Sequence, residues 1–164
     1  MSSGDLWCTP DDLYQVLDAE FNFEFDLCAS SENTKCQRWT NDIEAYTKKA
    51  RSFKDLPVDS QDPMGFLDHS YWMNPPYSRG NLEKCLKAAM ELVANGATVV
   101  ALLPDDASTK WYQTYVQDKA NQIRRLNRRV KFVGAKNCSP GGNCVAVYDK
   151  RFTDPDRTIS WGWK

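Results

Sequence analysis

The sequence of 164 residues lacks the residue groupings that usually hold metals. It contains a single histidine, His69, and its six cysteines include no pair with C-x-x-C spacing. Zinc sites in proteins normally draw on such pairs and on neighbouring histidines. The sequence therefore predicts no metal site, and reduced thiols that are mostly buried.

Long apolar runs and an excess of charge are also missing. No run approaches the roughly 20 apolar residues that a membrane span requires, and the N-terminus shows no basic and apolar signal pattern. We therefore expect a cytoplasmic protein. The formal net charge is -1, so any affinity for nucleic acid has to come from a local cluster of basic residues.

Neither an internal repeat nor a low-complexity linker divides the chain, whose length suits one domain. Apolar runs at residues 71–73, 97–103 and 144–148 predict strands. The segment between the first two of these runs has helical spacing, and this order predicts a parallel βαβ unit. The expected fold class is therefore α/β, with a mostly parallel twisted sheet.

The remaining elements are predicted from capping residues and apolar spacing. Thr9 should cap a helix that starts at Pro10 and ends before Phe21. Two further helices are expected over residues 43–50 and after the turn at residues 78–81. The end of the chain should form an edge strand.

Residues 21–27 alternate between apolar and polar side chains, which predicts a strand with one apolar face. That face comprises Phe21, Phe23, Phe25 and Leu27. The small residues Cys28 and Ala29 follow, and they would let a ligand approach the backbone closely. Ligands of open α/β sheets bind beyond the carboxyl ends of strands, where this turn would lie. A G-x-G-x-x-G motif for dinucleotide phosphates is absent here.

The aromatic run Tyr71-Trp72-Met73 ends in the sequence Asn74-Pro75-Pro76-Tyr77. Two consecutive prolines fix the backbone and end the strand rigidly. The Asn74 side-chain oxygen and the Pro75 carbonyl are left as hydrogen-bond acceptors beside one flat ring. Such a set suits a planar amine, whose N–H bonds the acceptors take while the ring stacks on its face.

Basic residues concentrate between residues 119 and 136, with no acid among them. They are Lys119, Arg124, Arg125, Arg128, Arg129, Lys131 and Lys136. Such a cluster is either a solvated face or a phosphate-binding surface. In a nearly neutral protein, phosphate binding requires a local concentration of arginine, so we favour DNA contact. Val130 and Phe132 are expected to form a strand beside it.

Four motifs occur in an order that resembles the phage-type DNA N6-adenine methyltransferase (Dam-like) family, over residues 7–147. They are Trp7-x-Thr9-Pro10, Phe25-Asp26-Leu27-Cys28-Ala29, Asn33-x-Lys35-Cys36 and Asn74-Pro75-Pro76-Tyr77-Ser78. The resemblance implies a single-domain Rossmann-like methyltransferase fold over residues 1–164, with helices on both faces of the sheet and no separate target-recognition domain. It also implies a phage or prophage protein in a bacterial host.

The same resemblance implies that S-adenosyl-L-methionine methylates the N6 amino group of an adenine flipped out of double-stranded DNA. The catalytic residues would be Asn74, Pro75, Pro76 and Tyr77. The implied cofactor-binding residues are Trp7, Thr9, Pro10, Asp26, Cys28, Ala29 and one acid after the second strand, either Asp42 or Asp55. The candidate DNA-binding residues are Ser78, Arg79, Arg124, Arg125, Arg128, Arg129 and Lys131.

Target recognition would have to come from loops at residues 52–69 and 137–143, or from a second subunit, and both a monomer and a homodimer are compatible with the sequence. The resemblance makes GATC a candidate target. Two alternatives remain open. The same fold could methylate another amino group, in RNA adenine, cytosine N4 or protein glutamine, or the chain could be an inactive partner that binds DNA or cofactor.

Overall fold

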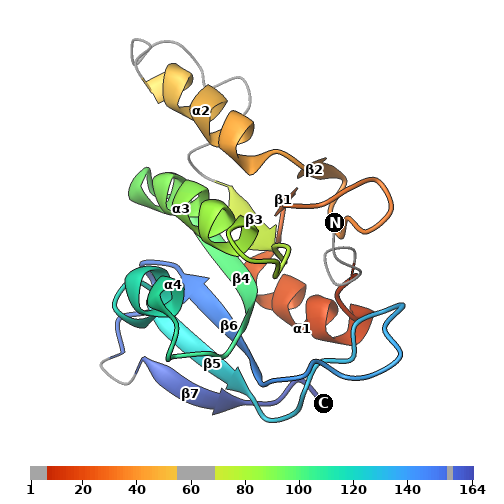
Figure 1. The fold of residues 1–164 in the computed structure, drawn as a ribbon. Coiled ribbons are helices and arrows are strands. Elements are labelled where there is room, and N and C mark those ends of the chain that lie inside the picture. Colours follow the sequence, from red (N-terminus) through yellow and green to blue (C-terminus); the bar gives the residue numbers. More distant parts are fainter. Residues whose placement is uncertain (1–6, 55–68, 155–156) are drawn as a thin grey trace.

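The structure, a computed structural model, describes residues 7–54, 69–154 and 157–164 (Figure 1). Within these residues the strands form one seven-stranded sheet in the order β2-β1-β3-β4-β6-β5-β7. Every strand runs in one direction except β6, which is antiparallel to β4 and β5. The strands are β1 (Phe25–Leu27), β2 (Arg38–Thr40), β3 (Ser70–Met73), β4 (Thr98–Pro104), β5 (Gln122–Leu126), β6 (Asn143–Tyr148) and β7 (Thr158–Trp161).

Helices cover both faces of the sheet, as the fold prediction required (Figure 1). One face packs against α2 (Ile43–Lys54), α3 (Asn81–Ala94) and α4 (Lys110–Tyr112), which continues into the π-helical turn η2 (Gln113–Gln117). The other face packs against α1 (Asp11–Phe21). The predicted α/β fold with a mostly parallel sheet is therefore confirmed. None of the helices in the described ranges has the length and apolar composition of a membrane crossing.

The central strands β3, β4 and β6 are apolar at every position after the first, because both of their faces are covered. In β3, Tyr71 and Met73 belong to the core under α2 and α3, whereas Trp72 belongs to the core under α1. Strand β4 alternates in the same way and lies between β3 and β6. The predicted strands at residues 97–103 and 144–148 are thus confirmed, and β7 is the expected edge strand beside β5.

The predicted boundaries of the first helix are wrong by one residue at each end. Helix α1 begins at Asp11, the cap position belongs to Pro10, and Thr9 is a buried residue outside the helix. The helix includes Phe21 and stops at Asn22, whose left-handed φ of 52° turns the chain. The backbone N–H of Asn22 closes that turn on the Asp18 carbonyl at 2.7 Å.

This turn also overturns the prediction of one apolar face over residues 21–27. Strand β1 covers only Phe25–Leu27. Phe21 and Phe23 lie in the core on the α1 side, while Phe25 and Leu27 lie in the core on the opposite face. Because the helix extends into the alternating segment, a period of two does not hold through it.

The strand expected around Val130 and Phe132 is not formed. Strand β5 ends earlier, at Leu126, and the following segment makes one isolated bridge, between Cys8 and Val133. Both Val130 and Phe132 are nevertheless buried on the α1 side of the sheet. Of the two proposed recognition loops, most of residues 52–69 lies outside the described residues.

Candidate active site

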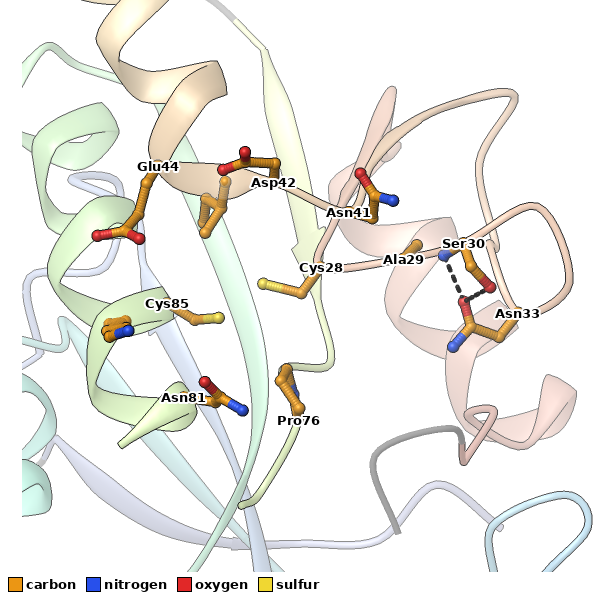
Figure 2. A pocket seen from close by; sticks show the side chains of 12 residues that line it. Cys28, Ala29, Ser30, Asn33, Asn41, Asp42, Glu44, Pro76, Asn81 and Cys85 are labelled. Atoms are coloured by element: carbon orange, nitrogen blue, oxygen red, sulfur yellow. Dashed lines mark hydrogen bonds between the residues drawn. The ribbon is translucent and has the colours of Figure 1, made fainter. Parts of the chain in front are cut away.

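A cavity of about 380 Å³ lies beyond the carboxyl ends of β1, β2 and β3 (Figure 2). The turn after β1 contributes part of residues 28–33, the connection from β2 to α2 contributes residues 41–44, and Pro76 follows β3. The first turns of α3 complete the wall. Ligands of open α/β sheets bind at this edge, next to the strand from which successive connections run in opposite directions. Here that strand is β1, which lies between β2 and β3.

The turn after β1 presents small residues and one fixed amide to the cavity. Cys28 has a left-handed φ of 64°, and the Ala29 N–H donates to the Thr40 carbonyl at 2.9 Å. The backbone N–H and the hydroxyl of Ser30 both donate to the side-chain oxygen of Asn33, at 2.7 and 3.1 Å (Figure 2). The NH2 group of Asn33 therefore remains available to a ligand.

Two thiols face each other across the cavity, Cys28 from the turn and Cys85 from α3 (Figure 2). The hydrogen bond that Cys28 donates to Cys85 raises the pKa of Cys28, and burial raises it further. The same hydrogen bond lowers the pKa of Cys85. All six cysteines of the chain are free. In the described ranges, no group of three His, Cys, Asp or Glu side chains could hold a metal ion.

Asp42 lies two residues beyond the end of β2, on the cavity wall. Its Oδ1 accepts the Ala45 N–H at 2.9 Å, which caps the first turn of α2. The second carboxylate oxygen is free to accept from a ligand. The alternative candidate, Asp55, lies outside the described residues.

Asp26 does not line the cavity. It is buried beneath the turn, and its Oδ2 accepts the Lys35 N–H at 2.8 Å. Burial raises the pKa of Asp26 to about 7, although the bond from Lys35 opposes the shift. This geometry gives Asp26 a role in holding the loop that carries Cys28, Ala29 and Asn33.

The N-terminal motif lies beside that loop and the Asn74 segment and does not line the cavity. Trp7 stacks on Phe132 with a centroid distance of 5.4 Å. Thr9 is buried, and Asp11, the residue after Pro10, forms an ion pair with Lys35 at 2.5 Å.

The Asn74-Pro75-Pro76-Tyr77 segment directly follows β3. The side-chain nitrogen of Asn74 donates to the Trp7 carbonyl at 3.1 Å, which leaves Oδ1 as an unused acceptor. The half-buried Tyr77 donates its hydroxyl to the Leu102 carbonyl at 3.0 Å, and the Phe132 ring lies nearly perpendicular to its ring, with a centroid distance of 6.0 Å. Burial raises the pKa of Tyr77 well above its ordinary value.

The predicted DNA contact of Arg124 needs correction, because this side chain is buried. Its guanidinium makes two hydrogen bonds of 2.6 Å to the carboxylate of Glu20. It also lies over the rings of Phe21, Phe152 and Trp161. A guanidinium enclosed in this way cannot reach a phosphate without breaking the packing between α1 and the C-terminal strands.

The other basic candidates are accessible. Arg125 pairs with Asp105 at 3.1 Å and is half exposed. Arg128 lies over the Trp163 ring, and Arg129 and Lys131 are exposed without a charged partner in the described part of the chain. Arg79 is exposed at the turn before α3, where the Ser78 hydroxyl accepts from Asn81 at 2.8 Å.

Several cavity residues were not predicted from the sequence. Asn81, Lys84 and Cys85 come from the first turns of α3, and Glu44 comes from the start of α2. Helical spacing identifies which residues face the core, but it does not indicate which end of a helix approaches a ligand. These side chains line the cavity because the starts of α2 and α3 lie close to the turn after β1, and this proximity is visible only in the folded structure.

Comparison with known proteins identifies the family of the chain. Residues 1–162 match the family model described as DNA N-6-adenine-methyltransferase (Dam). The DNA N-6-adenine-methyltransferase of Haemophilus phage HP1 (strain HP1c1) is 33% identical over 134 residues, which cover 80% of this chain and 68% of the phage protein. The motifs around Trp7, Asp26 and Asn74 predicted this relationship. The chain therefore belongs to the Dam family of DNA N-6-adenine-methyltransferases.

Proposed function

We propose that this protein transfers a methyl group from S-adenosyl-L-methionine to the N6 amino group of adenine in double-stranded DNA. The observation that carries the proposal is the position of Pro76. This residue belongs to the Asn74–Tyr77 segment and also lines the cavity beyond β1 and β2. A cofactor in that cavity and a base beside Asn74 would therefore share one wall, as direct methyl transfer requires.

The cavity has the size and the donor set that this cofactor needs. A volume of about 380 Å³ lies within the range of small-molecule sites. The free oxygen of Asp42 would accept a ribose hydroxyl, and the NH2 group of Asn33 would donate to the methionine carboxylate. Cys28 and Ala29 allow close approach of the backbone. When bound, the cofactor would supply an electrophilic methyl group on a sulfonium.

Asn74 and Pro75 would prepare the amine for attack. The lone pair of an aromatic amine is delocalised into the ring, so the nitrogen is a poor nucleophile. The Asn74 Oδ1 and the Pro75 carbonyl would accept its two N–H bonds and favour a pyramidal nitrogen. The contact between the Asn74 amide nitrogen and the Trp7 carbonyl already orients this amide for that purpose. Positioning and electrostatics would then supply most of the acceleration.

Tyr77 would bind the flipped adenine through its ring. Its hydroxyl proton is committed to the Leu102 carbonyl, and burial raises the pKa of the phenol still further above neutral pH. The side chain is thus suited to stacking and not to accepting a proton. The proton of the amine would leave late, through Asn74, Pro75 or water.

Exposed cations near the same edge would hold the DNA backbone. Arg128, Arg129 and Lys131 lie on the segment whose Phe132 contacts Tyr77, and Arg79 and Ser78 follow the catalytic segment. We propose a single domain in which loops read the target, with GATC as the candidate sequence. The loop at residues 137–143 belongs to the same connection between β5 and β6.

The proposal is tested by incubating the protein with isotope-labelled S-adenosyl-L-methionine and unmethylated duplex DNA. The DNA is then digested and its nucleosides are separated by mass. Labelled N6-methyladenine is expected, and sequencing of the modified positions would identify the target. N4-methylcytosine, or transfer only to RNA or protein, would favour a different acceptor. Cofactor binding by calorimetry without any transfer would indicate an inactive partner subunit.

A further inference from the structure

Val133 is the most exposed large apolar residue in the described part of the chain. Its exposed fraction is 58%, compared with 41% for Val16 and 37% for Trp39. Single apolar side chains on a surface are common and need no explanation by themselves. The surroundings of Val133 set it apart from the other two.

The backbone around Val133 is held in place. Its N–H donates to the Cys8 carbonyl at 3.0 Å, and the two residues form a β-bridge. Gly134 follows with a φ of 86°, and the Ala135 N–H closes a turn on the Phe132 carbonyl at 3.1 Å. A left-handed glycine at this point reverses the chain directly after the valine. The side chain is therefore presented at a fixed, tight turn.

The segment before this turn has an inner and an outer face. Val130 and Phe132 are buried, whereas Lys131 and Val133 are exposed. An extended chain separates such alternate residues by about 7 Å, on the same side. Lys131 and Val133 thus form an outward-facing pair, one cationic and one apolar.

The inner face of this segment packs against Tyr77, which belongs to the Asn74–Tyr77 segment where the adenine would bind. The Phe132 ring lies nearly perpendicular to the Tyr77 ring, with a centroid distance of 6.0 Å, and stacks on Trp7 with a centroid distance of 5.4 Å. The Trp7 carbonyl, in turn, orients Asn74. Val133 is the next residue after Phe132, so it lies at the rim of the site in which the adenine would bind.

The rim is basic. No acid occurs between Asp118 and Asp149, and the exposed cations of this stretch include Arg128, Arg129 and Lys136. In Figure 1 the connection from β5 to β6 extends beside α1, away from α2 and α3. An apolar side chain on a segment with several exposed cations is suited to enter a duplex whose phosphates those cations hold.

We propose that Val133 is a wedge that enters the base stack when the target adenine is flipped out. The inference rests on the proposed function. Extrusion of a base from a duplex leaves a gap and breaks the stacking and pairing of that base. Proteins that distort DNA insert apolar side chains at such steps. Val133 fills the gap while Lys131, on the same outer face, contacts a neighbouring phosphate.

The test compares Val133→Ala with Val16→Ala, which removes the same atoms from another exposed valine. Once the target is known, two duplexes are used, one with the target adenine paired to thymine and one with it mismatched to cytosine. A mismatched base is easier to flip. On the paired duplex, Val133→Ala should lower kcat/KM about tenfold, equivalent to about 1.4 kcal/mol. On the mismatched duplex its loss should be less than about twofold.

A second readout follows base extrusion without methyl transfer. Fluorescence of 2-aminopurine at the target position should rise when the wild type and Val16→Ala bind, and should rise less with Val133→Ala. Equal losses on both duplexes, or full activity and fluorescence of Val133→Ala, would overturn the wedge while leaving the proposed function intact. A wild type that methylates no DNA would overturn both.

Discussion

The side-chain nitrogen of Asn74 donates a hydrogen bond of 3.1 Å to the backbone carbonyl of Trp7, 67 residues earlier in the chain. This contact decides which end of the amide faces a ligand. Because the donor is occupied by Trp7, the acceptor Oδ1 is the free end. The N-terminal segment therefore orients the group that should receive an N–H of adenine.

Asn74→Ala should reduce kcat by about 10²- to 10³-fold, the usual effect of deleting one pre-organised hydrogen-bonding group. Asn74→Asp keeps an acceptor for the amine but turns a second acceptor toward the Trp7 carbonyl, so activity should also fall, by at least about tenfold. The matched control is Asn95→Ala, which removes another amide bonded to a carbonyl, that of Glu91 at 2.8 Å. Single-turnover methylation and thermal unfolding are measured for each. Activity of Asn74→Ala equal to that of the control would refute the assignment.

Asp42→Ser should weaken binding of S-adenosyl-L-methionine about tenfold, because serine is too short to reach a ribose hydroxyl. Serine preserves an N-cap for the Ala45 N–H, so stability should change little. Calorimetric titration gives the dissociation constant, and Asp106→Ser, in a turn away from the cavity, is the control. Unchanged affinity in Asp42→Ser would direct attention to Asp55.

Asp26 should make the protein less stable as pH rises. Burial raises its pKa from 3.8 to about 7, so the folded state binds this proton more tightly than the unfolded chain does. The resulting stabilisation is complete below about pH 4 and is lost as pH rises toward about 7, with a size on the order of a few kcal/mol. Asp26→Asn retains an acceptor for the Lys35 N–H but does not titrate. Urea unfolding across this range should show a decline for the wild type that is smaller in the variant, and parallel pH profiles would contradict the assignment.

Alanine substitutions at Arg124 and Arg129 should affect different properties, the first the free energy of unfolding and the second the affinity for DNA. Arg124→Ala removes a buried guanidinium that pairs with Glu20 and packs on Trp161, and should lower the free energy of unfolding by about 2–3 kcal/mol. Glu20 is partly exposed and can be hydrated again, which limits the loss.

Arg129→Ala should leave unfolding unchanged. It should weaken DNA binding on all sequences and reduce the slope of log affinity against log salt by about one. Denaturant unfolding and fluorescence anisotropy with a duplex at several salt concentrations measure the two effects. An Arg129→Ala variant with an unaltered salt slope would remove this residue from the interface.

Local patterns predicted most of the architecture. Continuous apolar runs identified β3, β4 and β6, since strands covered on both faces contain few polar positions. The helix predicted after the turn at residues 78–81 is α3, which ends at Ala94, with Gly96 just beyond it at a φ of 102°. The prediction failed at residues 21–27, where α1 continues to Phe21 and turns at Asn22, so that Phe21 and Phe23 pack on the α1 side of the sheet while Phe25 packs on the opposite side.

The sequence by itself determined the order of the elements, the rigid Asn74–Tyr77 segment after β3 and the family. Apolar periodicity and proline geometry act over a few residues, so they can be read along the chain. Only the tertiary structure decided that Arg124 is enclosed, that Asp26 lies beneath the loop and that Asp42 lines the cavity. The environment of a charged side chain depends on groups far away in sequence, such as Glu20 for Arg124, and no local pattern encodes such pairs.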